Sequence, residues 1–256
     1  GMVLQRNTEI RLSGFGNASG ADILATLTDK NGNLLAVASE KTTMGQFSVT
    51  LPALPAAKGL TLNIRISNGA DIFYEKTFTD VAVGEVWILS GQSNMWLPVH
   101  QMEDAAEYLA NADNYGDNIR YFSQDRAASF TPMTDTVNGG WYTATKKNLT
   151  TRAISGIGYV MATRLADQLD GVPVAIIDAY YEGSSIVTWF DLDTIRSTYP
   201  SLYTTYLDYE SKGTPSSWNK VPSVCYNQMV HPIKGYTASG VIWYQGESDI
   251  GISSLY

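Results

Sequence analysis

The spacing of apolar residues changes once along this chain, and the change limits the folds open to it. Up to about Val81 apolar and polar residues alternate, most clearly in 60–66, which is the period of a strand with one buried face. After Val83 the pattern becomes continuous apolar runs, at 86–89, 172–177 and 240–244, which is typical of strands buried on both faces. We therefore predict a β-rich region at 1–82 and an α/β region at 83–256.

The first region has the features of an antiparallel β-sandwich. Its short alternating segments are separated by Asn, Gly and Pro, and the sequence Asp29-Lys30-Asn31-Gly32 is suited to a hairpin turn. Short strands linked in this way pack as two antiparallel sheets around one core. We expect this small domain to end near residues 80–84.

The second region alternates strand-like and helix-like segments. In the clearest helical segment, 155–169, Ile157, Met161 and Leu165 recur every fourth residue, with Gly171 and Pro173 just beyond the end. Strands that alternate with helices predict a parallel sheet. At 256 residues and 44% hydrophobic content, the chain is long enough to bury such a sheet.

Charge and composition exclude several functions. A net charge of −8 gives no basic surface for a nucleic acid, whereas uncharged glycans remain possible partners. The single cysteine, Cys225, excludes an internal disulfide, and the two histidines, His100 and His231, are too few and too scattered for a zinc site. No apolar segment is long enough to span a membrane. We expect a chain without a metal, a cofactor or a membrane span; its oligomeric state is not indicated.

Each continuous apolar run ends in a turn of glycine and small polar residues, at 91–94, 182–185 and 245–249. Parallel sheets bind ligands at the carboxyl ends of their strands, so these turns would meet if the strands are neighbours. Ser93, in a tight turn after a strand, could present its hydroxyl as a nucleophile. Gly183 could offer a backbone N–H, and Gln245 a side-chain amide, to a developing oxyanion.

Each of these residues also has an ordinary structural interpretation. Gly-x-Ser turns are common, Gly183 alone would be a turn glycine, and Gln245 and Glu247 alone would be a strand cap and a solvated acid. Tryptophans beside these turns are more often core residues than platforms for sugars. The catalytic hypothesis therefore depends on all three turns occurring together.

Three segments resemble the sialate O-acetylesterase group of the SGNH hydrolases. They are Met2-Val3-Leu4-Gln5-Arg6, the block from Gly84 to Met95 that contains Ser90-Gly91-Gln92-Ser93-Asn94-Met95, and Gly240-Val241-Ile242-Trp243-Tyr244-Gln245-Gly246-Glu247-Ser248. The resemblance implies a flavodoxin-like, three-layer hydrolase domain at 83–256 after a β-sandwich domain at 1–82. It also implies a cofactor-free esterase, exported to the periplasm or beyond, that removes acetyl groups from sialic acid or related sugars.

The resemblance also assigns roles to individual residues. Ser93 is the nucleophile, and its own N–H, the N–H of Gly183 and the amide of Gln245 form the oxyanion hole. We expect Gln92, Asn94, Glu247 and His231 to line the substrate pocket or to support these groups. His231 matches a family position before the third block, not the triad histidine, so a structural or pocket-lining role is favoured.

The sequence departs from the family pattern at two points. Glu182 stands where the family has a small residue, and because a carboxylate would repel an oxyanion, we expect its side chain to point away from Ser93. The family's catalytic Asp and His follow the third block in an Asp-x-x-His segment, whereas this sequence stops at Tyr256. We therefore expect an incomplete hydrolase domain, nearly inactive as given. The alternative function is a glycan-binding protein or an inactive remnant of an esterase.

Overall fold

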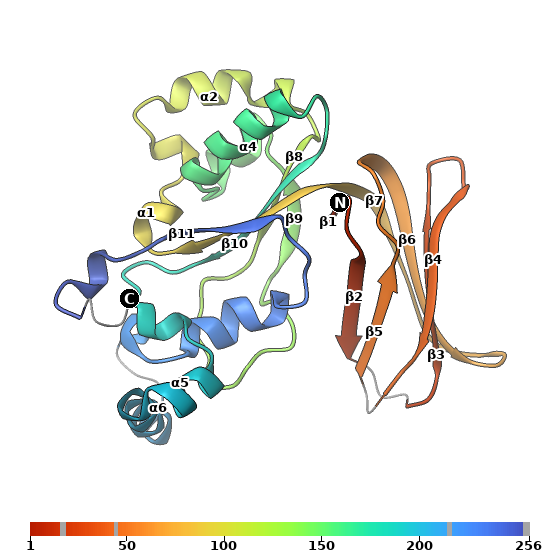
Figure 1. Ribbon diagram of the computed structural model, residues 1–256. Coiled ribbons are helices and arrows are strands. Elements are labelled where there is room, and N and C mark those ends of the chain that lie inside the picture. Colours follow the sequence, from red (N-terminus) through yellow and green to blue (C-terminus); the bar gives the residue numbers. More distant parts are fainter. Residues whose placement is uncertain (16–18, 44–45, 214–216, 253–256) are drawn as a thin grey trace.

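The computed structural model describes residues 1–15, 19–43, 46–213 and 217–252 (Figure 1). The strands are β1 (Val3–Gln5), β2 (Ile10–Phe15), β3 (Asp22–Thr28), β4 (Leu34–Lys41), β5 (Gln46–Leu51), β6 (Ala57–Asn68), β7 (Asp71–Gly91), β8 (Ile119–Ser123), β9 (Gly140–Thr143), β10 (Val174–Tyr180) and β11 (Gly240–Tyr244). The α-helices are α1 (Ser93–Trp96), α2 (Ala105–Asn111), α3 (Lys146–Thr151), α4 (Gly156–Gln168), α5 (Leu192–Thr198) and α6 (Pro200–Lys212). Within the described ranges, no helix has the length and apolar character needed to cross a membrane.

The amino-terminal strands form two antiparallel layers. β3 pairs with β4 and β6, β6 pairs with β7, and β2 pairs with β5 in a separate two-stranded sheet. The predicted turn at 29–32 is confirmed: Asp29 Oδ1 accepts the N–H groups of Asn31 and Asn33, at 2.8 and 2.9 Å, and Gly32 has a φ of +83°. The Asn33 side-chain amide also donates to Asp29 Oδ2 at 2.8 Å, and this bond, followed by the backbone bonds, lowers the pKa of Asp29.

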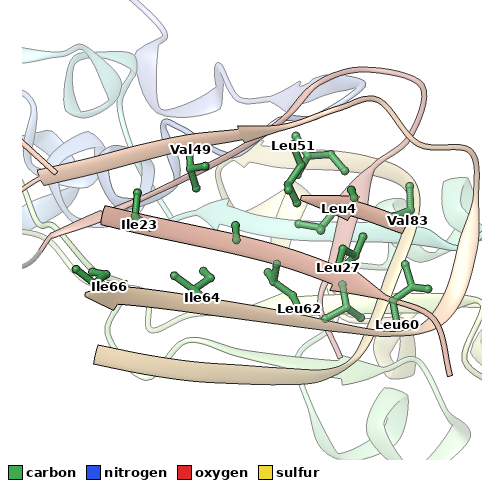
Figure 2. Close-up of a cluster of buried hydrophobic side chains, with 14 of the residues drawn as sticks. Leu4, Ile23, Leu27, Val49, Leu51, Leu60, Leu62, Ile64, Ile66 and Val83 are labelled. Carbon is green, nitrogen blue, oxygen red and sulfur yellow. The ribbon is translucent and has the colours of Figure 1, made fainter. Parts of the chain in front are cut away.

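The core of this region follows the predicted alternation. Leu60, Leu62, Ile64 and Ile66 on β6 are each no more than 9% exposed, and they pack beside the inward side chains of β3 (Figure 2). Burying an aliphatic side chain of this size stabilises the fold by roughly 1.5–3 kcal/mol. A shift of β6 by one residue would turn these four side chains toward solvent, so their burial fixes the register of the strand.

Strand β7 is continuous through the predicted domain boundary. Its 21 residues pair with β6 in the antiparallel layer near one end and with β10 and β11 in a parallel sheet near the other. The boundary at 82/83 thus falls inside one strand. A separate sandwich domain at 1–82 stays a prediction, whereas the mixed α/β architecture with a mostly parallel central sheet is present.

In the second region the strand order is β9-β8-β10-β7-β11, and β9 alone among these is antiparallel to its neighbour. Alternate residues of β10 enter different cores: Val174 and Ile176 pack with α4, whereas Ala175 and Ile177 pack with the segment around Met229. Helices α2 and α4 lie on one side of the sheet, and α5 and α6 lie on the other (Figure 1). This arrangement is consistent with the hydrolase fold that the resemblance implies.

The predicted helix at 155–169 is present, but another face is buried. Helix α4 begins after Ser155, whose side chain accepts the Gly158 N–H. Its buried face is Gly158, Tyr159, Ala162 and Ala166, whereas Ile157 is 37% exposed. A Cβ on Gly158 would lie 2.3 Å from Leu89 Cδ1, so small residues let the helix approach the sheet closely.

Strand β11 also differs from the prediction. Its apolar run suggested burial on both faces, yet Val241 is 60% exposed and Tyr244 is 45% exposed. Within the described part of the chain, β11 pairs with β7 and lies at the sheet's edge. Hydrophobicity alone does not distinguish a central strand from an edge strand, because pairing depends on distant segments.

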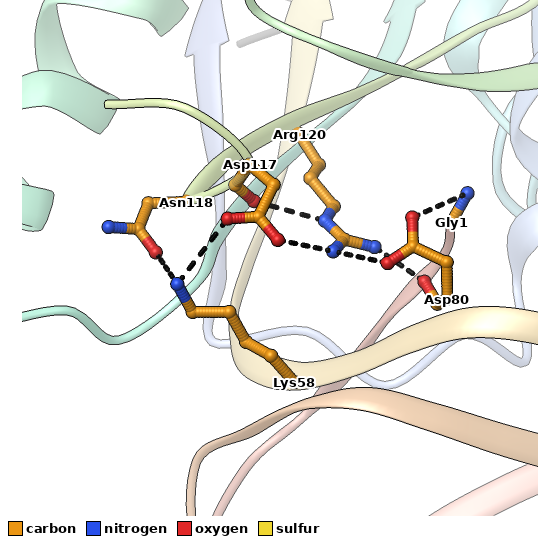
Figure 3. Close-up of polar contacts among 6 residues, drawn as sticks. All are labelled: Gly1, Lys58, Asp80, Asp117, Asn118 and Arg120. Carbon is orange, nitrogen blue, oxygen red and sulfur yellow. Dashed lines mark hydrogen bonds and ion pairs between the residues drawn. The ribbon is translucent and has the colours of Figure 1, made fainter. Parts of the chain in front are cut away.

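A buried arginine joins the two regions. Arg120 of β8 is 1% exposed, and its guanidinium donates to the Asp80 carbonyl oxygen at 2.6 Å and to Asp80 Oδ1 at 2.9 Å (Figure 3). Its Nε donates to the Asp117 carbonyl oxygen at 3.1 Å. Lys58 of β6 pairs with Asp117 at 3.4 Å and bonds to Asn118. These contacts tie β6 and β7 to the loop before β8.

Candidate active site

Ser93 lies where β7 ends and the short helix α1 begins. Its side chain is exposed, and its N–H and hydroxyl donate to no acceptor among the described residues. Gly91 makes this turn possible: with a φ of +138°, it lies so close to β11 that a Cβ would be 2.0 Å from the Tyr244 carbonyl oxygen. The strand therefore presents a serine hydroxyl and an unpaired N–H at the carboxyl edge of the sheet.

Gln92 connects this turn to the loop after β11. The residue is 3% exposed, and its Oε1 accepts the N–H groups of Gly246 and Ser248 at 3.3 and 3.2 Å. Its own N–H donates to the Tyr244 carbonyl oxygen at 3.0 Å. Gln92 thus holds the loop that contains Gln245 against the backbone beside Ser93.

The loop after β10 is bonded to the same turn. The Gly91 carbonyl oxygen accepts the Tyr181 N–H at 3.0 Å and the Ser184 hydroxyl at 3.3 Å. Gly183 has a φ of +65°, and a Cβ there would lie 2.7 Å from Asn219 Nδ2. Its N–H donates to no acceptor in the described part of the chain. The three strand-end turns, predicted to meet if their strands were neighbours, are therefore neighbours.

Gln245 is held by several acceptors. Its Nε2 lies 2.7 Å from the Ser184 carbonyl oxygen, 2.6 Å from Asp249 Oδ2 and 3.2 Å from Gln92 Oε1. An amide carries two hydrogens, so the amide of Gln245 is engaged within the protein in this structure. The contacts place Gln245 between the other two loops.

Asp249 is a site residue that the sequence patterns did not single out. It is 3% exposed, and its carboxylate accepts the Ser185 hydroxyl, the Ile186 N–H at 2.8 Å and the Gln245 amide. One buried carboxylate therefore joins the loop after β10 to the loop after β11. The only signal in the sequence was its position four residues after Gln245, because its other bonded partners, Ser185 and Ile186, are more than sixty residues away.

Three further polar residues of these turns contact each other or a neighbouring loop. Asn94 donates to the Glu247 carboxylate across the mouth of the turn. Glu182 is 53% exposed, and its Oε2 lies 3.6 Å from Arg126 Nε, so it pairs with a cation of the loop after β8. Arg126 also stacks on the ring of Trp96, with its Cζ 4.5 Å from the ring centroid.

Neither histidine is bonded to the nucleophile turn. His231 Nδ1 lies 2.7 Å from the Met133 carbonyl oxygen, and His231 lines a pocket with Arg11 and Ser13 of β2. His100 Nδ1 lies 3.2 Å from the Leu149 carbonyl oxygen. The structure thus brings Ser93, Gln92, Asn94, Gly183, Gln245 and Glu247 together and places His231 among other residues.

A buried acid lies next to the strand end. Asp178 of β10 accepts the hydroxyls of Tyr121 and Tyr180 on one oxygen, and its other oxygen has no partner among the described residues. Burial raises the pKa of Asp178 well above its usual range, and it raises that of Tyr180 as well. Since Tyr180 pairs with Gly91, this cluster supports the strand end that carries Ser93. No group of three or more potential metal-ligating side chains occurs in the described ranges.

Two hollows lie near these loops. One, of about 550 Å³, is mostly apolar and lies between α1 and α4, with Asn94 and Tyr244 at its rim. The other, of about 570 Å³, is polar and is formed by residues 123–127, residues 151–153 and Glu182. The turn thus combines an exposed serine hydroxyl with unpaired backbone donors at the edge of an α/β sheet, which are groups that acyl transfer can use.

Comparison with known proteins gives the family. Residues 83–254 match the family model described as carbohydrate esterase, sialic acid-specific acetylesterase, and the chain belongs to this family. The sialate O-acetylesterase of Homo sapiens is 30% identical over 180 residues, which cover 68% of this chain and 33% of that protein. The Mus musculus enzyme is 28% identical over 196 residues, covering 66% and 36% respectively.

A solved structure of a carbohydrate acetylesterase has a similar fold. The crystal structure of a carbohydrate acetylesterase from Xanthomonas citri superposes with a TM-score of 0.76 at 29% identity. The match covers 96% of this chain and 49% of that one. The chain thus spans about half the length of this solved relative and about a third of the curated relatives. The family resemblance predicted from the sequence is confirmed.

Proposed function

We propose that this chain carries the nucleophile of a carbohydrate O-acetylesterase. The observation that supports it best is the bonding of three strand-end loops around one exposed serine. Gln92 and Ser184 join the neighbouring loops to the nucleophile turn, at the edge where open α/β sheets bind ligands. The substrate is an acetyl ester of sialic acid or a related sugar.

In this proposal the Ser93 hydroxyl attacks the acetyl carbonyl carbon while a base accepts its proton. The tetrahedral intermediate then expels the sugar oxygen, which is protonated, and leaves an acetyl ester on Ser93. Water hydrolyses that ester and releases acetate. The N–H groups of Ser93 and Gly183, which have no acceptor among the described residues, stabilise the oxyanion.

Gln245 supplies the third donor in the proposed oxyanion hole. Its Nε2 already contacts three acceptors, so donation to the oxyanion requires one of those contacts to lengthen. The base is the part of the proposal that rests on resemblance alone: an Asp-x-x-His segment following the third block. Export of the protein likewise rests on the family resemblance.

Activity of the native-length protein tests the proposal. We expect release of acetate from O-acetyl sugars and from p-nitrophenyl acetate, and Ser93→Ala should lower kcat by at least about 10³-fold. Ser201→Ala, an exposed serine on α6, is the matched control and should keep full activity. Equal rates for the wild type and Ser93→Ala would reject a Ser93 esterase. Sugar binding without any turnover would instead support the alternative, a glycan-binding protein.

A further inference from the structure

The polar hollow beside the Gly183 loop is lined by both acidic and basic side chains. Its volume is about 570 Å³, and its lining includes Arg126, Arg152, Asp125 and Glu182. Glu182 directly precedes Gly183, so the hollow opens next to the loop that carries a proposed oxyanion donor. A group bound there would adjoin an acetyl ester held at Ser93.

The two guanidinium groups are held in fixed planes. Arg126 lies over the Trp96 ring of α1, the helix that begins at Ser93, and pairs with Glu182. Arg152 lies over the Tyr142 ring, with 3.6 Å from its Cζ to the ring centroid. Stacking on an aromatic ring limits the rotation of a guanidinium and leaves its N–H edge free to donate. The hollow therefore offers preorganised hydrogen-bond donors.

Acceptors lie beside these donors. Asp125 Oδ2 accepts the Asn138 amide at 2.6 Å, which fixes that carboxylate. Glu182, 53% exposed, adds a second carboxylate to the lining. Donors and acceptors side by side match a ring that carries several hydroxyl groups.

The charges that line the hollow indicate whether the bound sugar ring is itself charged. Two arginines face two carboxylates, so the lining is formally neutral, and the chain as a whole carries a net charge of −8. At short range a sugar with its own carboxylate would meet the two carboxylates of the lining as well as its two arginines, so it gains no net attraction there, and at long range it would meet a negative protein. Uncharged hydroxyl groups bond to both signs without this penalty.

We propose that this hollow is a subsite for an uncharged, polyhydroxylated sugar ring, the ring that bears the acetyl ester or its neighbour. The inference rests on the proposed esterase function and narrows its substrate class from sialic acid and related acetylated sugars to the uncharged sugars among them. Arg152 is the better of the two arginines for a test. It stacks on Tyr142, whereas Arg126 contacts α1 and the Gly183 loop, so its replacement could disturb the nucleophile turn.

The selectivity between two esters tests the subsite. In the native-length protein we expect Arg152→Met to lower kcat/KM for uncharged O-acetyl hexopyranosides, relative to p-nitrophenyl acetate, by about 10-fold or more, because the ring would lose its hydrogen bonds from a charged donor. Arg164→Met, an exposed arginine on α4, is the matched control and should leave the ratio unchanged. An unchanged ratio in Arg152→Met would overturn the subsite.

The charge argument has its own test. The wild type should favour uncharged O-acetyl hexopyranosides over O-acetylated sialic acid, and Glu182→Gln should shift that preference toward sialic acid. A wild type that prefers sialic acid, and loses that preference in Arg152→Met, would show a carboxylate site and overturn the uncharged class.

Direct binding separates this inference from the esterase proposal. In the Ser93→Ala background, calorimetric titration with an uncharged O-acetyl hexopyranoside should show binding that Arg152→Met weakens by about 10-fold. Loss of p-nitrophenyl acetate hydrolysis in Ser93→Ala reports on the esterase function alone. Sugar binding that Arg152→Met does not weaken overturns the subsite, even if Ser93 is the nucleophile.

Discussion

At the scale of single residues, the candidate site is held by side chains whose partners come from other loops. Gln92, Ser184 and Asp249 each bond to a segment far away in the sequence. None of them needs to touch the substrate. They fix where the N–H groups of Ser93 and Gly183 point, and the value of an oxyanion hole depends on such preorganisation.

Asp249 gives the clearest test at this scale. Asp249→Ala in the native-length protein should lower kcat for acetyl esters by about 10²-fold with a smaller change in KM, because the loss of a preorganised donor acts mainly on the transition state. Asp249→Asn keeps the shape of the side chain and one of its two oxygens, so part of the lost kcat should be recovered. Asp193→Ala, on the exposed side of α5, is the control.

A purely structural role for Asp249 predicts something different. It would lower the melting temperature and the fraction of active protein but leave kcat per titrated active site unchanged. Inhibition by a boronic acid, whose serine adduct is tetrahedral, should weaken in Asp249→Ala by the same factor as kcat/KM falls. Unaltered inhibition would contradict the positioning role.

Sequence patterns singled out Ser93, Gly183 and Gln245 as candidates because each follows an apolar run, and parallel sheets place their sites at the carboxyl ends of such strands. They did not anticipate Asp249 or Arg126. Both contact partners on other loops or on α1, and a carboxylate or guanidinium in a loop looks the same in a sequence whether it is solvated or buried.

At the scale of elements, helix α4 shows where periodicity misleads. The helix and its start at Ser155 were predicted, but large apolar residues suggested the wrong buried face. Gly158, Ala162 and Ala166 face the sheet because the space between helix and sheet is small, and Leu89 fills it from the other side. Packing distance is set by the tertiary structure, so it is not visible in the apolar spacing of one segment.

Two substitutions on α4 separate the two faces. Gly158→Val should lower the free energy of unfolding by at least about 2 kcal/mol, because overpacking a close contact displaces the helix from the sheet. Ile157→Ala, on the exposed face, should cost less than about 1 kcal/mol. Urea unfolding measures both. The reverse order would mean that the face with Ile157 is the buried one.

At the scale of the whole molecule, two regions of different architecture share one long strand. β7 begins in the antiparallel layer and ends at the nucleophile turn, so the two parts are joined by backbone pairing as well as by side chains. The change of hydrophobic period near residue 82 located the change of architecture. It did not show that one strand runs through it, because periodicity reports burial and not strand continuity.

The Arg120 contacts should stabilise this junction. Arg120→Met keeps the apolar stem but removes the bonds to Asp80 and Asp117, and we expect it to lower the free energy of unfolding by about 1–3 kcal/mol. Lys58→Met removes a partly exposed pair nearby and should cost less than about 1 kcal/mol. Thermal or urea unfolding of both variants measures the two losses of stability. An equal, small effect would mean that the buried arginine does not hold the regions together.

Trapping the acyl-enzyme shows whether Ser93 is the nucleophile of an acetylesterase. Native-length protein mixed with p-nitrophenyl acetate and quenched in acid should yield one peptide, containing residues 91–95, that is heavier by one acetyl group, with the label on Ser93. Ser93→Ala should yield none. Rapid release of acetate without acetyl-Ser93, or with the label on another residue, would contradict the account.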